Sequence, residues 1–298
     1  MMVEIQNPSI KLKGYLNKQD YLEIKKLMKS CIEKENVTLK LELDYKLGRE
    51  NESEDFKINE FMYYNEELLI GYLGICQFSG EALEVNGMVH PEYRRKGVFK
   101  SLFSLVEDEW NKRKTKDMLL LNDHTSRSGY EFIKQTSAQY DNSEYEMFLR
   151  GEPKFNLDRI AEITFRKATN KDAKDIAEQN SIYFNQSIES LDLVLPEDEA
   201  KRGVDIYLAE VEQTVVGKVQ VGVSDGIGGI FGLGVLPNFR RRGFGKEILL
   251  KAIDLLKEKQ VNEIMLQVAV ENEHALDLYK SCGFVVTSTM DYYKMSKK

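Results

Sequence analysis

The 298-residue sequence lacks the features that mark several classes of protein. Its only cysteines, Cys31, Cys76 and Cys282, are odd in number and widely spaced, which fits neither a disulfide framework nor a CxxC metal site and indicates reduced thiols. Its three histidines are scattered, so we expect no metal centre. No apolar run approaches the ~18 residues of a transmembrane helix, and the first residues lack a signal-peptide core. We therefore expect a cytoplasmic protein without a membrane partner.

Excess positive charge is also missing. Lysine and arginine total 42 against 49 aspartates and glutamates, so the net charge is −7 and the pI about 5.3. General binding to nucleic acid needs a basic face, so we expect no nucleic-acid partner. The negative charge is compatible with a cationic small molecule as ligand. The remaining composition, 42% hydrophobic and 31% charged, is typical of a globular protein. At roughly 100–200 residues per domain, the length predicts two domains.

The two halves of the chain repeat one pattern. A single offset of 146 residues aligns much of them without gaps, and chance would not keep one register over so long a stretch. The matched positions are Leu69–Gly71 with Val215–Gly217, Val89 with Val235, Pro91 with Pro237, Tyr93–Gly97 with Phe239–Gly243, Lys100 with Lys246, Gly129 with Ala275, and Phe132 with Leu278. The segment Gly151–Lys154 contains Gly and Pro and is typical of a linker. We predict domains over residues 1–152 and 153–298.

Hydrophobic periodicity in the second half predicts the order β-α-β-β-β-α-β-α-β. Strands are expected over 162–167, 205–211, 215–224, 230–236 and 264–268, helices over 170–183, 243–259 and 272–281, and a last strand or hairpin over 283–296. Thr169, followed three residues later by Asp172, indicates a helix N-cap. The first half repeats this order, with less regular material before residue 60. The fold class is therefore α+β or mixed α/β around one sheet.

In the segment Val235–Lys246 a strand ends, a basic glycine turn follows and a long helix begins. The amides of such a turn point into one space, and the helix N-terminus adds partial positive charge, which together suit a phosphate. Gly243 and Gly245 permit close backbone approach or a φ that side chains disfavour. Taken alone, a glycine pair more often indicates a solvated basic turn that caps a helix.

The pattern Arg240-x-x-Gly243-x-Gly245 resembles the acetyl-CoA motif of the GNAT superfamily of N-acetyltransferases. A second segment, at the expected distance, is similar to another motif of that superfamily: Asn272-x-x-Ala275-x-x-Leu278-Tyr279-x-x-x-Gly283-Phe284. The resemblance covers residues 163–296. Together with the repeat, it implies two GNAT-like domains, each a mixed, mostly antiparallel sheet flanked by helices.

The resemblance implies an acetyl-CoA site and one catalytic residue. The backbone of Leu233, Gly234 and Val235 would bind the pantetheine arm and polarise the acetyl carbonyl. Asn272 would contact the same arm. Tyr279 would protonate the departing thiolate, because a tyrosine with the ordinary pKa of ~10 keeps its proton at neutral pH. The pyrophosphate would lie against Arg240, Arg241, Arg242, Gly243, Phe244, Gly245 and Lys246. Asn272 can equally be a helix N-cap, and Tyr279 a core aromatic.

The first half has lost parts of this site. Arg94-x-x-Gly97 remains, but Phe99 stands where the second glycine belongs and would crowd the phosphate approach. Ile133 replaces the tyrosine and cannot donate a proton. Two further replacements are Ser126 for Asn272 and Ser137-Ala138 for Gly283-Phe284. We therefore predict that the first domain keeps the fold and has a weakened or lost site.

The function expected from the resemblance is direct transfer of acetyl from acetyl-CoA to the amine of a small molecule or peptide, in a ternary complex and without a metal. The general base stays open among Glu210, Asp225 and a water molecule. Five acids either attract a cationic amine or form a solvated loop: Glu189, Asp192, Glu197, Asp198 and Glu199. The alternatives are a non-catalytic acetyl-CoA-binding regulatory or scaffold protein, transfer of a longer acyl chain, and a nucleic-acid binder. The acceptor and the oligomeric state remain open.

Overall fold

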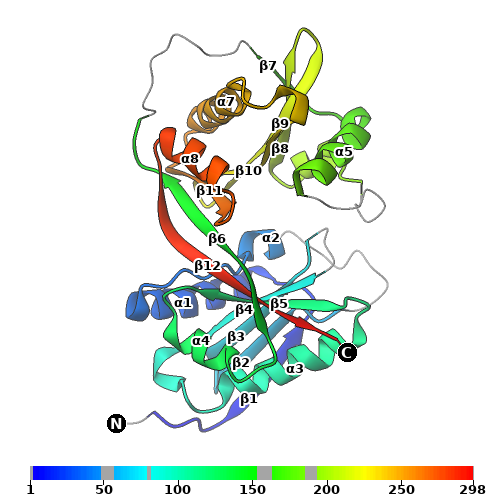
Figure 1. Cartoon of the computed structure of the whole chain (residues 1–298). Coiled ribbons are helices and arrows are strands. Elements are labelled where there is room, and N and C mark those ends of the chain that lie inside the picture. Colours follow the sequence, from blue (N-terminus) through cyan, green and yellow to red (C-terminus); the bar gives the residue numbers. More distant parts are fainter. Residues whose placement is uncertain (1–2, 48–56, 79–81, 153–162, 185–192, 298) are drawn as a thin grey trace. The chain divides into compact units, whose positions relative to one another are not determined.

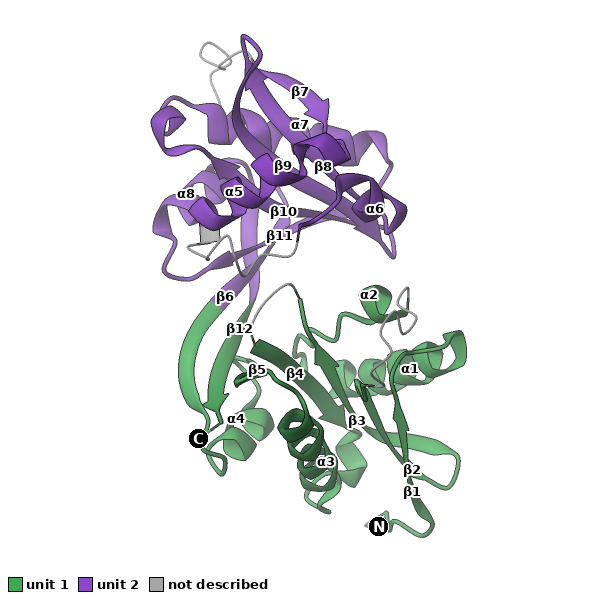
Figure 2. Ribbon diagram, turned by 90° about the vertical axis from the view of Figure 1, so that its right-hand side faces the viewer, with its two compact units in different colours: residues 1–143, 289–298 green, residues 144–288 purple. Residues whose placement is uncertain are grey.

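The structure, a computed structural model, describes residues 3–47, 57–78, 82–152, 163–184 and 193–297 (Figure 1). The chain forms two compact units (Figure 2). Unit 1 consists of residues 1–143 and 289–298, and unit 2 of residues 144–288. Among the helices of the described residues, none is both long and apolar enough to cross a membrane.

Unit 1 is a sheet covered by helices on both faces. Its elements are β1 (Pro8–Lys13), α1 (Lys18–Glu35), α2 (Leu43–Leu47), β2 (Glu60–Asn65), β3 (Leu68–Cys76), β4 (Ala82–Val89), η1 (Pro91–Tyr93), α3 (Val98–Lys112), β5 (Asp117–Asp123), α4 (Arg127–Ile133) and β6 (Gln139–Leu149). The strand order is β1-β2-β3-β4-β5-β12, in which β12 (Phe284–Ser296) comes from the end of the second repeat. Only the β4–β5 pair is parallel among the described pairings of this unit. Gly71 faces Val98 of α3, whereas its neighbour Tyr72 packs in the cluster that includes Ile24 of α1. Successive residues of β3 therefore serve opposite faces, as strand alternation requires.

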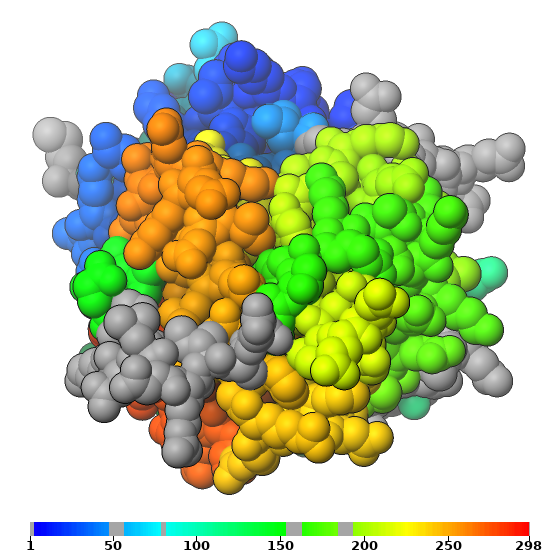
Figure 3. Space-filling model, turned by 90° about the horizontal axis from the view of Figure 1, so that it is seen from above, coloured from blue at the N-terminus to red at the C-terminus, as the bar shows by residue number. Residues whose placement is uncertain are grey.

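Unit 2 has the same layers. Its elements are β7 (Thr164–Lys167), η3 (Asn170–Asp172), α5 (Ala173–Phe184), α6 (Pro196–Lys201), β8 (Val204–Val211), β9 (Thr214–Ser224), β10 (Ile227–Val235), η5 (Pro237–Phe239), α7 (Phe244–Glu258), β11 (Glu263–Ala269), α8 (Glu273–Ser281) and β12 (Phe284–Ser296). The order is β6-β11-β10-β9-β8-β7, with β10–β11 parallel. From above, α7 (orange) lies on one side of the unit and the α5–α6 region (green) on the other (Figure 3). Both units thus confirm the predicted mixed, mostly antiparallel sheet flanked by helices.

The two units exchange their last strands. Residues 144–148 of β6, which follow the first repeat, pair with Met265–Ala269 of β11. Residues 290–296 of β12, at the end of the second repeat, pair with β5. Each sheet is therefore completed by a strand from the other half of the sequence, and β6 and β12 change colour along their length in Figure 2. The compact units consequently differ from the division at residue 152, which remains a prediction about the sequence repeat.

This exchange predicts which fragments of unit 2 fold. A fragment of residues 139–288 keeps β6 beside β11, whereas a fragment of residues 153–288 leaves the edge of β11 unpaired. Unpaired edges invite aggregation. We expect the shorter fragment to aggregate, or to unfold roughly 10 °C or more below the longer one in thermal unfolding followed by circular dichroism. Equal stability of the two fragments would show that β6 is dispensable for unit 2.

Most predicted elements lie within a few residues of the observed ones. Thr169 and Asp172 form a capping box before α5, as predicted. The final segment is one 13-residue strand rather than a hairpin, because its second half continues into the sheet of unit 1. Gly151 lies two residues after the end of β6, and the predicted linker from Pro153 on lies outside the described residues. The three cysteines are free and buried.

Candidate active site

The basic turn has the backbone of an anion site. Arg241 has φ +63° and Gly243 has φ +89°, so two positions of the turn adopt the left-handed conformation. Gly243 is the N-cap of α7 and has no side chain to bond the first-turn amides. The side chains of Arg241 and Arg242 are exposed, while Phe244 is buried. The turn can therefore offer main-chain N–H groups and two arginines to a phosphate.

The motif arginine holds the turn against the preceding strand. Nε of Arg240 donates to the carbonyl oxygen of Val235 at 3.0 Å. Unit 1 repeats this geometry, since Nε of Arg94 donates to the carbonyl of Val89 at 3.0 Å. Gly97 also has φ +82°, close to the value at Gly243. The repeated motif thus has one backbone conformation in both units, whatever each unit binds.

The two central strands of unit 2 part beside this turn. The parallel register between β10 and β11 runs from Ile227–Glu263 to Ile230–Leu266, and β11 then continues along β6. On its other edge, β10 stays paired with β9, with a register shift between Phe231 and Gly234. The N–H of Leu236 donates to β9, so by alternation the N–H of Val235 faces the edge that β11 has left. This is where the sequence predicts the pantetheine arm.

Helix α8 meets the turn and the strand at Gly245. A Cβ at Gly245 would lie 3.6 Å from Cδ2 of Leu278 and 3.6 Å from Cγ2 of Val235. These are ordinary van der Waals distances, so a side chain at position 245 would not clash with the protein. Position 243, in contrast, favours glycine because its φ is positive. Asn272 is exposed and caps α8, with Oδ1 accepting from the N–H of Ala275 at 3.2 Å. The capping role considered for Asn272 is therefore present.

Tyr279 lies in the core of unit 2, next in sequence to Leu278. Its side chain is 8% exposed and packs edge-on to Phe284, with ring centroids 6.3 Å apart. Burial raises the pKa of Tyr279 to about 12. The phenol is consequently protonated throughout the neutral range. The packing makes Tyr279 a core aromatic. Its phenol also carries a proton at neutral pH, as a proton donor must.

The opposite face of the parted strand carries polar residues that the sequence analysis missed. The ring of Tyr183, from α5, lies directly on Gly234, because a Cβ there would come within 2.2 Å of the ring. The Tyr183 hydroxyl donates to Oε1 of buried Gln179 at 3.0 Å. Lys218 of β9 is fully buried, and its Nζ donates to the carbonyl of Gly232 at 3.0 Å. Lys218 is the one charged residue of β9, and this was the available signal.

The acids considered as bases lie away from the parted strand or have structural partners. Glu210 accepts from Nε of Arg166 at 2.9 Å, and Asp225 lies in the turn before β10. Glu197 bonds Asn170, Asp198 pairs with Lys201, and Glu199 pairs with Arg202. Glu189 and Asp192 lie outside the described residues. Four of the described acids of this group, Glu210, Glu197, Asp198 and Glu199, thus have structural partners.

Asp172 links β7 to the helix that carries Tyr183. It accepts from the backbone N–H of Thr169 at 2.8 Å and from both terminal nitrogens of Arg166 at 2.9 Å. These hydrogen bonds, chiefly those from Arg166, hold the pKa of Asp172 at about 2. A carboxylate with a depressed pKa stabilises the fold above its unfolded pKa, and the contribution is lost as the pH falls through about 2.

We therefore expect Asp172→Asn to lower the free energy of unfolding at pH 7 by about 1–2 kcal/mol, as loss of a helix cap does. The difference from wild type should shrink as the pH falls from 4 toward 2, because wild-type Asp172 then gains a proton. Thermal unfolding across this pH range measures the difference, with Asp175→Asn, at an exposed position of the following helix α5, as the control. A difference that stays constant with pH would contradict the assignment.

A cavity of about 660 Å³ lies at the matching place in unit 1. Its lining includes Arg94, Gly97, Phe99, Ser126 and Ile133. The ring of Phe99 packs edge-on to Phe132, with centroids 4.5 Å apart. The Arg94 guanidinium pairs with Glu35 of α1, which brings a carboxylate to the motif arginine. Unit 1 thus keeps space at this position, without the tyrosine and with a negative charge near the basic turn.

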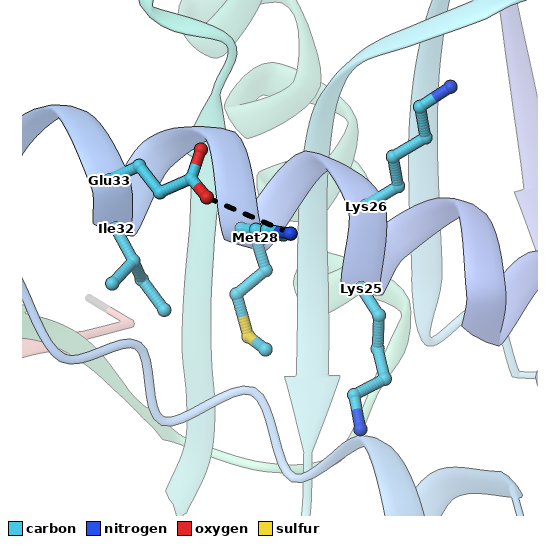
Figure 4. A pocket seen from close by; sticks show the side chains of 6 residues that line it. Lys25, Lys26, Met28, Ile32 and Glu33 are labelled. Atoms are coloured by element: carbon cyan, nitrogen blue, oxygen red, sulfur yellow. Dashed lines mark ion pairs between the residues drawn. The ribbon is translucent and has the colours of Figure 1, made fainter.

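Another hollow lies along the exposed face of α1 (Figure 4). Its lining residues, among them Lys25, Met28 and Ile32, all belong to that helix, and Lys29 pairs with Glu33 at 3.8 Å. Because a single helix supplies all of them, no second element of the described chain converges on it, and we do not consider it a candidate site.

Comparison with known proteins agrees with the geometry. Residues 172–284 match the model of the acetyltransferase (GNAT) family. Mycothiol acetyltransferase of Renibacterium salmoninarum is 28% identical over 109 residues, which are 37% of this chain and 30% of that protein. The chain spans less than half the length of curated relatives such as this one.

Two solved structures share the fold over nearly the whole chain. A GCN5-related N-acetyltransferase from Sphaerobacter thermophilus has a TM-score of 0.74 at 19% identity, covering 96% of this chain and 95% of its own. A tandem GNAT protein from the clavulanic acid biosynthesis pathway has a TM-score of 0.70 at 12% identity, covering 97% and 98%. Nearly the whole chain therefore shares its fold with these two proteins. Residues 172–284, which lie within unit 2, match the acetyltransferase (GNAT) family, and the likeness beyond them is one of fold.

Proposed function

We propose that the chain is an N-acetyltransferase that moves the acetyl group of acetyl-CoA to the amine of a small molecule or peptide, and that unit 2 performs the reaction. The convergence at Gly245 carries the proposal, because Val235 and Leu278 both lie 3.6 Å from its Cβ position. A parted strand, a helix N-terminus without a side-chain cap and the helix that bears Tyr279 thus meet at one place. An acyl donor with a long arm and a pyrophosphate needs these parts.

The main chain would supply most of the donor contacts. The amides from Arg241 to Lys246 and the N-terminus of α7 suit the pyrophosphate, and the exposed arginines add attraction at long range. The N–H groups of Leu233 and Val235 suit the pantetheine arm and the acetyl carbonyl. A donor fixed on rigid backbone needs little reorganisation when negative charge develops on that carbonyl oxygen.

The chemistry needs one proton donor and one proton acceptor. The neutral acceptor amine attacks the acetyl carbon, so a C–N bond forms and the C–S bond breaks. Tyr279 gives its proton to the departing sulfur, and the amine loses one proton to water or to a base. Each described acid considered above either lies away from the parted strand or has a structural partner. We therefore assign the proton of the amine to a water molecule.

A transfer assay tests the proposal. Purified protein is incubated with acetyl-CoA and, in turn, with an α-amino peptide, a polyamine, an aminoglycoside and an amino acid. We expect release of free thiol that matches the acetylated amine found by mass spectrometry. Binding of acetyl-CoA with no product from any amine would favour the non-catalytic regulatory protein instead. Competition with longer acyl-CoAs then measures the acyl-chain preference.

A further inference from the structure

Lys218 is a buried cation next to the parted strand. Its side chain is 0% exposed, and its Nζ donates to the carbonyl of Gly232 at 3.0 Å. The ring of Tyr183 lies 5.7 Å from the same nitrogen. Within the part of the chain that the structure describes, no carboxylate forms an ion pair with Lys218. Buried lysines without such a partner are costly to the fold, which points to a use for this charge.

At the matching place, unit 1 pairs its buried lysine with a carboxylate. Tyr72 lies 146 residues before Lys218 and is also fully buried. Its hydroxyl donates to Oε2 of Glu60 at 2.5 Å, and Lys46 donates to the same carboxylate at 3.1 Å. In unit 1 the buried cation, Lys46, is paired with the carboxylate of Glu60. The ammonium of Lys218 is hydrogen-bonded to a peptide carbonyl instead. The two units differ at a position where their backbones correspond.

The carbonyl that Lys218 binds belongs to the peptide group that ends in the N–H of Leu233. In a planar trans peptide, the C=O and the N–H point in opposite directions. The Leu233 N–H is therefore directed away from Lys218. Gly234 lies opposite Lys218 in the pairing of β10 with β9. By alternation along the strand, the backbone N–H of its neighbour Leu233 faces the edge where β11 has parted from β10.

We propose that the Lys218 ammonium polarises the Gly232–Leu233 peptide, so that the Leu233 N–H becomes a stronger hydrogen-bond donor to the acetyl carbonyl oxygen during transfer. The inference rests on the proposed function. A hydrogen bond from a cation is stronger than one between neutral groups, and hydrogen bonds in series strengthen one another in a buried site. Lys218 acts through the peptide, so it is a positioning residue rather than a group that touches the substrate.

The protonation of Lys218 supports this role. Burial lowers its pKa to about 8, because desolvation disfavours the charged form. The side chain is consequently mostly an ammonium ion at pH 7. Its bond to the Gly232 carbonyl requires a donor, which both forms of the amine provide, but only the charged form polarises the peptide strongly.

Three variants test the role of the charge. Lys218→Met keeps the length and removes the charge, Lys218→Arg keeps the charge, and Lys174→Met removes an exposed lysine of α5 as the control. We expect Lys218→Met to lower kcat on the order of tenfold, less than deletion of an oxyanion donor, with KM for acetyl-CoA within about twofold. Lys218→Arg should recover part of the loss, and Lys174→Met should match wild type.

A second measurement needs no acceptor and no turnover. Acetyl-CoA labelled at the carbonyl carbon is bound to each protein, and difference infrared spectroscopy records the carbonyl stretch. We expect the band to move to lower frequency in the wild-type complex than in water, and to lose part of that shift in Lys218→Met. An unchanged band in a variant that still binds and folds overturns the inference.

The remaining outcomes are equally decisive. If Lys218→Arg is as inactive as Lys218→Met while its carbonyl band matches wild type, the lysine acts as a base and the inference fails. Acetylation of Lys218 itself, seen by mass spectrometry of its peptide, also overturns it. If wild-type protein binds acetyl-CoA with the shifted band and acetylates no amine, the proposed function fails and the polarisation stands.

Discussion

Replacement of Tyr279 by phenylalanine is expected to lower kcat for acetyl transfer by about 10²–10⁴-fold and to leave the affinity for acetyl-CoA nearly unchanged. The phenol is buried, and its pKa of about 12 keeps it protonated at neutral pH. Loss of the hydroxyl leaves the thiolate without a positioned donor. The ring remains, so its packing against Phe284 is preserved. Steady-state kinetics with acetyl-CoA and the best acceptor of the panel measure the effect.

The control is Tyr207→Phe, which removes a hydroxyl from another tyrosine of unit 2 that stacks on Phe165. Both variants should unfold within a few degrees of wild type, since neither changes the packed volume much. If Tyr279→Phe keeps full activity, the tyrosine is a core aromatic only, and the sulfur takes its proton from water.

Replacement of Gly243 by glutamate is expected to weaken acetyl-CoA binding by at least about a hundredfold. Gly243 has φ +89°, so any side chain there is strained by about 1–3 kcal/mol. The new carboxylate also stands at the N-terminus of α7, where it repels a phosphate and offsets the helix dipole. An added Cβ meets no protein atom within 4 Å, so the effect is not a clash in the described structure. Gly243→Ala separates strain from charge.

The internal repeat supplies a matched control. Gly97 has φ +82° and an equally open Cβ position, so Gly97→Glu imposes the same strain and charge on unit 1. If unit 2 holds the donor, Gly97→Glu leaves the affinity within about threefold of wild type. The opposite pattern, with loss in Gly97→Glu and binding in Gly243→Glu, would place the donor in the cavity of unit 1.

The local features of the site could be predicted from the sequence because they depend on neighbours along the chain. The turn from Pro237 to Lys246, the cap at Asn272 and the box at Thr169 involve residues within a few positions of one another. Backbone conformation at such places follows from residue type, since glycine accepts positive φ and asparagine bonds the third amide of a helix. The repeat extended the same reasoning to unit 1.

The exchange of β6 and β12 could not be predicted in this way. Both halves carry the same pattern, so each last strand can fit either sheet, and hydrophobic alternation does not say which. The pairing of β12 with β5 joins residues more than 160 positions apart. The contact between Lys218 and Gly232 has a similar origin, because it depends on how β9 registers with the shifted strand β10.

The directions of individual side chains were the other feature that could not be predicted from the sequence. Phe99 was expected to crowd the phosphate approach; its ring packs on Phe132 and also lines the cavity of unit 1, so this expectation stays a prediction. Glu210 was open as a base, and it binds Arg166. Residue type alone does not say toward which neighbour a side chain turns, since the packing of the finished sheet decides it.

The measurement that tests the central claim most directly is a calorimetric titration of acetyl-CoA into the intact chain, read for its stoichiometry. The account predicts one site per chain, in unit 2, with heat that vanishes in Gly243→Glu. Two sites would contradict the view that unit 1 has lost its own, and no binding would contradict the assignment of acetyl-CoA to this chain.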